Sequence, residues 1–119
     1  MRRAVRSSPH DPLNWFYMFW IGVFQYFAGA DAESAETMRN VARVPPGPAS
    51  REVTHYPIRW LAQALGQLGQ VAEAKRELEK AVAISPVFFR RISHQRPPWM
   101  RPEDYARVLD GLRRAGWKG

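Results

Sequence analysis

The chain has 119 residues, a net charge of +7, three histidines and no cysteine. The length fits a single domain, and the lack of cysteine excludes disulfides, thiolate metal sites and cysteine nucleophiles. No apolar run directly follows the basic residues 1–8, so no secretory signal is indicated and we expect a cytoplasmic protein.

Residues 1–12 have the pattern of the end of a helical repeat. Ala4 and Pro9 stand in the same relation as Ala81 and Pro86 further along the chain. We therefore expect this segment to be the remnant of a preceding repeat, and the chain to be the C-terminal part of a longer protein.

Residues 13–48 predict a first helix pair. The first helix, over residues 13–28, is apolar nearly all round and is interrupted only by Asn14 and Gln25, so it must be buried on several sides. Its apolar stretch of 16 residues is shorter than the roughly 20 that a membrane span needs. Gly29 suits the left-handed position of the turn, and a partner helix over residues 32–44 ends at the prolines that follow.

Residues 49–54 are interpreted as an insertion, and residues 55–88 predict a second pair of the same kind. Pro57 is tolerated in the first turn of its first helix, Gly69 makes the turn, and Ser85-Pro86 closes the second helix. Residues 89–119 predict a basic loop and a last helix from Pro102 that caps the array.

Both pairs share one spacing pattern, with a period of about 40 residues. The first copy is Met18, Ile21, Gly22, Gly29, Ser34, Met38, Val41 and Pro46, and the second is Ile58, Leu61, Ala62, Gly69, Ala74, Leu78, Ala81 and Pro86. This spacing resembles the tetratricopeptide repeat, which implies an all-α solenoid of antiparallel helix-turn-helix units with a C-terminal capping helix.

The pattern also predicts how the helices of a pair meet. Small side chains are expected where the backbones approach, and larger ones between them. The small residues are Gly22, Ser34, Ala62 and Ala74, and the larger ones are Ile21, Met38, Leu61 and Leu78.

The resemblance implies a non-catalytic module for protein–protein interaction. Residues 101–116 further resemble the C-termini of repeat-bearing bacterial class III adenylate/guanylate cyclases and winged-helix regulators, which implies a signalling protein with its catalytic or DNA-binding domain upstream. The family binds partners on the concave face of its first helices. Here that groove would present Phe16, Phe19, Val23, Tyr26, Phe27, Tyr56, Arg59, Gln63 and Gln67.

The nature of this groove favours an apolar partner. Only Arg59 is basic, whereas the family's clamp for peptide carboxylates needs Lys and Asn, so we expect an amphipathic helix or self-contact instead. The upstream domain of the same polypeptide and a homodimer through the aromatic first helix are the expected partners.

An alternative function rests on the basic tail, where residues 87–119 carry eight basic and three acidic side chains. Such a tail can bind nucleic acid or another acidic surface, although we do not expect nucleic acid to be the main partner. The candidate anion patch is Arg90, Arg91, His94, Arg96 and Arg101. No spacing predicts a catalytic set, a metal site or a cofactor.

Overall fold

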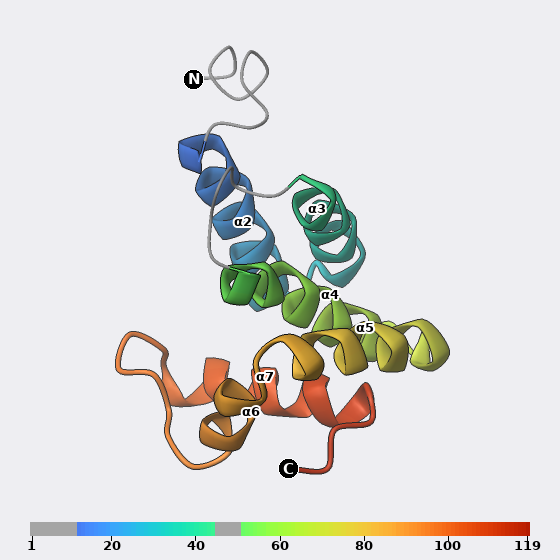
Figure 1. Cartoon of the computed structure of the whole chain (residues 1–119), viewed down its shortest axis with the longest axis vertical. Helices are drawn as coiled ribbons and strands as arrows, with labels where there is room; N and C mark the ends of the chain where they lie inside the picture. The colour runs from blue at the N-terminus through green and yellow to red at the C-terminus, as the bar shows by residue number, and fades with distance from the viewer. Residues whose placement is uncertain (1–11, 45–50) are drawn as a thin grey trace.

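The computed structural model describes residues 12–44 and 51–119, and these ranges are all-α, as the sequence predicts (Figure 1). Six α-helices and one short 3₁₀ helix occur in the described part, with no strand there. The elements are α2 (Pro12–Phe27), α3 (Asp31–Arg43), η1 (Arg51–Thr54), α4 (His55–Gln67), α5 (Val71–Ile84), α6 (Pro86–Ile92) and α7 (Pro102–Arg114).

Two antiparallel helix pairs, α2 with α3 and α4 with α5, form the body of the fold. Gly29 and Gly69 make the two turns with φ of +81° and +80°, a conformation that favours glycine. The predicted turns and pairs are therefore confirmed, which fits a helical-repeat fold.

Small residues bring the helices of each pair together as predicted. In the first pair, Ser34 is fully buried and its hydroxyl donates to the carbonyl of Gly22 at 2.8 Å. A Cβ on Gly22 would lie 2.7 Å from Met38 Cε, so only glycine fits that approach without rearrangement. In the second pair, Ala62 and Ala74 have no exposed surface.

Ile21 is the exception, because 41% of its surface is exposed. Trp20 and Phe24, which lie near it on α2, are also exposed. The prediction that Ile21 fills the gap within the first pair is therefore wrong, whereas Met38, Leu61 and Leu78 are buried as expected.

Helix α4 is the centre of the molecule. It packs against α3, α5 and α7, and every residue from Arg59 to Gly66 is buried. Figure 1 shows α4 between the α2–α3 pair and the C-terminal helices. A side chain that α4 contributes to a site is therefore positioned by a helix that is packed on several sides.

The terminal helix α7 packs across α4. The two backbones are closest where Gly66 and Gly111 meet, since a Cβ on Gly66 would lie 2.6 Å from the Gly111 carbonyl oxygen. Arg107 of α7 also forms an ion pair with Asp31 of α3 at 3.0 Å. Helix α7 therefore packs on the side of the molecule formed by α2 and α4, which are the first helices of the two pairs.

Some predictions fall outside the described residues. The expected repeat remnant lies there except for Pro12, and so do Pro46 and the first two residues of the expected insertion, whose residues 51–54 form η1. None of the described helices is both long and apolar enough to cross a membrane.

Candidate functional site

An aromatic pocket lies between α2 and the first turns of α4. It encloses about 330 Å³. Five of the predicted groove residues line it, namely Phe16, Phe19, Val23, Tyr56 and Arg59. Five further side chains line the pocket that were not predicted from the sequence to lie in the groove. They are Trp15, Trp20, Val53, Trp60 and Trp99.

Helical periodicity explains most of this lining. Phe16, Phe19 and Val23 recur at steps of three and four residues and therefore share one face of α2. Tyr56 and Arg59 share a face of α4 for the same reason. The sequence therefore predicts which of these side chains share a helix face, but not which element packs opposite that face.

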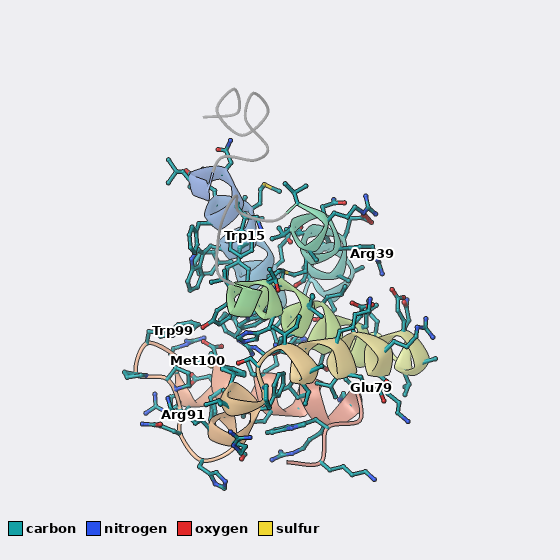
Figure 2. The ribbon with its side chains drawn as sticks, in the orientation of Figure 1. Trp15, Arg39, Glu79, Arg91, Trp99 and Met100 are labelled. Carbon is teal, nitrogen blue, oxygen red and sulfur yellow. The ribbon has the colours of Figure 1, made fainter. Side chains whose placement is uncertain are left out.

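Trp99 comes from the loop between α6 and α7 (Figure 2). Its ring centroid lies 5.5 Å from that of Trp20 in a T-shaped arrangement, and 6.5 Å from that of Phe27. Contacts of this kind between aromatic rings are favourable beyond the area that they bury. Trp99 therefore forms one wall of the pocket while remaining half exposed.

The inner half of the predicted groove is occupied by α7. The hydroxyl of the buried Tyr26 donates to the Arg107 carbonyl at 2.7 Å, and Gln67 Nε2 donates to Asp110 at 3.1 Å. Gln63 has no exposed surface. A Cβ on Gly111 would lie 3.1 Å from that of Gln63, so these side chains are covered rather than open to a partner.

Phe27 lies between the two halves of the groove. Its ring packs edge-on against Trp60 at 5.4 Å. The predicted groove is therefore divided into an open aromatic pocket near the start of α4 and a closed contact with α7 near its end.

Arg59 is the one charged side chain of the pocket lining, and it is only 4% exposed. Its Nη1 donates to Gln63 Oε1 at 2.6 Å, and its guanidinium lies 4.7 Å from the ring of Trp60 and 4.5 Å from that of Phe88. Desolvation by burial lowers the pKa of Arg59 to about 9. The group therefore remains a cation at pH 7, and none of the ion pairs among the described residues includes it.

Three buried donors near the pocket have no hydrogen-bond acceptor: Trp15 Nε1, Arg59 Nε and Gln63 Nε2. Buried polar groups are nearly always paired, because an unpaired one loses its hydration without compensation. Trp15 and Arg59 also line the pocket, so a ligand there that accepts hydrogen bonds could pair with Trp15 Nε1 and Arg59 Nε.

A second feature is the outward side of α2. It carries six exposed large apolar side chains, and we call these the outer face of α2. They are Leu13, Phe16, Tyr17, Trp20, Ile21 and Phe24. No acidic or basic residue occurs from residue 12 to residue 30. Clusters of exposed apolar side chains of this kind mark interaction surfaces.

The five residues of the candidate anion patch are all exposed, but they do not form one site. Arg101 pairs with Asp104 at 2.9 Å, and this hydrogen bond raises the pKa of Arg101. Arg96 donates to the carbonyl of Met100. Arg90 and His94 line one hollow, of about 550 Å³, together with Phe89 and Trp117.

The described residues contain no group of three His, Asp or Glu side chains that could hold a metal ion. His55 is fully buried and stacks near Tyr56 and Phe88, with ring centroids 4.2 and 4.9 Å away. His94 is exposed, and His10 lies outside the described residues.

The wall residues that sequence reasoning missed are mainly tryptophans. Trp15, Trp20 and Trp60 carry a usable signal, because they lie next to predicted groove positions on the same helices. No local pattern could have placed Trp99 in the pocket, because it lies 79 positions along the chain from Trp20.

No protein-family model matches the chain, and comparison with curated proteins and with solved structures found no match.

Proposed function

We propose that this protein is a non-catalytic module for protein–protein interaction, of the tetratricopeptide type, that associates with a second copy through the outer face of α2. The observation that carries the proposal is the exposure of that face. Phe24 alone is 63% exposed, and Ile21 and Trp20 beside it are also exposed. Covering these side chains would remove a continuous apolar surface from water, which is the main driving force of association.

Charge favours a second copy as the occupant. The chain carries a net charge of +7, so most pairings between two copies bring like charges together. Helix α2 lacks charged side chains after residue 11, and two such helices can therefore pack without this repulsion. The exposed rings can also stack on their own copies, because aromatic pairs are favourable in several geometries.

The alternative function, binding of an acidic surface through the basic tail, receives less support. Arg101 is neutralised by Asp104, and Arg96 is engaged by a backbone carbonyl. A dispersed patch of this kind lacks the concentrated field that steers an anionic partner.

The test is the absolute mass of the protein by light scattering after size exclusion, over a wide range of concentration and at low and high salt. We expect a dimer that persists at high salt, because apolar association is not screened. Phe24→Lys should yield a monomer, since it places a charge in the contact of each copy.

Val71→Lys is the matched control, because Val71 is similarly exposed but lies on α5. It should leave the dimer intact. A wild-type monomer at every concentration, or an equal effect of the two variants, would contradict the proposal.

A further inference from the structure

The aromatic pocket contains a cation that the described residues do not neutralise. Arg59 is buried, charged at pH 7 and bonded through Nη1 only to the neutral Gln63. Tyr56 and Tyr26 are the ionisable groups that act on it, and tyrosine is uncharged at neutral pH. Buried charges in proteins are normally paired with an opposite charge, and no described residue supplies that anion to Arg59.

The unpaired donors point to the form of that anion. Trp15 and Arg59 both line the pocket. Each has a buried N–H without an acceptor, Nε1 in Trp15 and Nε in Arg59. A carboxylate accepts through two oxygens and carries about four lone-pair sites, which satisfies such donors in a way that a neutral hydroxyl does not.

The other side chains that line the pocket favour a ligand in which an apolar group is attached to the carboxylate. Phe16, Phe19 and Trp20 line one side of the pocket, and Trp99 closes another. The volume of about 330 Å³ lies at the lower end of the roughly 300–1,000 Å³ that small-molecule sites occupy. A ligand with a single ring suits both the size and the aromatic lining.

The inner end of the groove excludes an extended peptide. Beyond the pocket, Tyr26 and Gln67 are bonded to α7, and Gly66 and Gly111 bring α7 against α4. A peptide chain therefore has no open path along the groove past Trp60. The pocket accommodates a small body rather than a strand or a helix.

We propose that the aromatic pocket binds a small aromatic carboxylic acid, with its carboxylate against Arg59 and its ring among the aromatic side chains of α2 and Trp99. This site goes beyond the proposed function: Phe16 and Trp20 belong both to the pocket and to the outer face of α2, but Arg59 belongs to the pocket alone. Ligand binding is therefore tested at Arg59, which is not part of the proposed self-association surface.

The test is calorimetric titration of the full chain at pH 7 with 3-phenylpropionate, and with its amide and its amine as probes of the same shape. The acid should bind about ten- to a hundredfold more tightly than the amide, because a hydrogen bond to a charged group is much the stronger. The amine should not bind, since it places a second cation beside Arg59. Octanoate should bind more weakly than 3-phenylpropionate, because it cannot stack on the rings.

Two variants test the role of Arg59. Arg59→Met should bring the affinity for the acid down to that for the amide, and Arg59→Lys should retain part of the preference. Replacement of a buried cation by an apolar side chain is often neutral or stabilising, and thermal unfolding verifies that the Met variant is folded. Arg91→Met, at an exposed arginine on α6, is the control that should leave binding unchanged.

Nuclear magnetic resonance supplies an independent readout. The indole N–H signal of Trp15 should move downfield when 3-phenylpropionate is added, because Nε1 gains an acceptor. Equal affinities for acid and amide, an unchanged preference in Arg59→Met, tighter binding of octanoate, or binding only of a peptide with a C-terminal phenylalanine would each overturn the proposal.

Discussion

The crossing of α4 and α7 depends on Gly66. A Cβ at this position would lie 2.6 Å from the Gly111 carbonyl oxygen and 3.1 Å from the Ala115 amide nitrogen. Both are backbone atoms and cannot rotate out of the way. Gly66→Ala should therefore force α7 away from α4.

The size of the effect follows from three contributions. Alanine gains at most about 1 kcal/mol over glycine in helix propensity. Overpacking costs about 1–3 kcal/mol, and displacement of α7 weakens two hydrogen bonds, from Tyr26 to Arg107 and from Gln67 to Asp110, each worth about 1 kcal/mol. We expect a net loss of about 1–4 kcal/mol in the free energy of unfolding.

Gly22→Ala is the matched control, because it also adds a methyl group at a helix–helix contact. The nearest atoms to its Cβ are Met38 Cε at 2.7 Å and Sδ at 3.1 Å. These atoms form the end of a flexible side chain, which can adopt another rotamer. Gly22→Ala should therefore stay within about 1 kcal/mol of the wild type.

Urea unfolding followed by circular dichroism measures both changes, and thermal unfolding checks them, since 1 kcal/mol moves the midpoint by about 4 °C in a chain of this size. The two variants are compared at equal protein concentration, because association would add to the apparent stability. If Gly66→Ala proved as stable as Gly22→Ala, the close approach of α7 to α4 at Gly66 would not be what limits the size of this residue.

Two further predictions concern the core. Ala74→Leu should cost about 1–3 kcal/mol, because Ala74 is fully buried between α4 and α5, whereas Ala72→Leu on the exposed side of α5 should be nearly neutral in the same unfolding assay. Burial raises the pKa of Tyr26 from its ordinary value of 10.0 to about 12, so its contribution to stability is complete below pH 10 and is lost as the pH rises to about 12. Over that range the wild type should lose about 2–3 kcal/mol more than Tyr26→Phe, and parallel pH curves would contradict this.

Most of the individual elements could be predicted from the sequence. Gly29 and Gly69 mark the turns because few other residues adopt a positive φ, and Pro102 begins the last helix because its missing N–H is not needed there. Gly22, Ser34 and Ala74 mark the contacts within each pair because only small side chains permit such close backbones. These are local rules, and they act over a few turns of helix.

The candidate site could be predicted only in part. Periodicity placed Phe16, Phe19 and Val23 on one face of α2, and the structure has them in one pocket. Periodicity could not show that Tyr26, further along the same helix, is covered by α7 while these three residues are not. The spacing of apolar residues indicates which face of a helix is buried, but it does not indicate which other element packs on that face.

The sequence by itself therefore determined the helices, their turns and the close packing within each pair, since these depend on the conformational limits and volumes of neighbouring residues. Only the tertiary structure decided that α7 crosses α4 at Gly66, that Trp99 reaches Trp20, and that Arg59 is buried with no anionic partner among the described residues. Each of these arrangements joins residues distant in sequence or depends on what surrounds a side chain, and it is selected by the packing of the whole chain rather than by any local pattern.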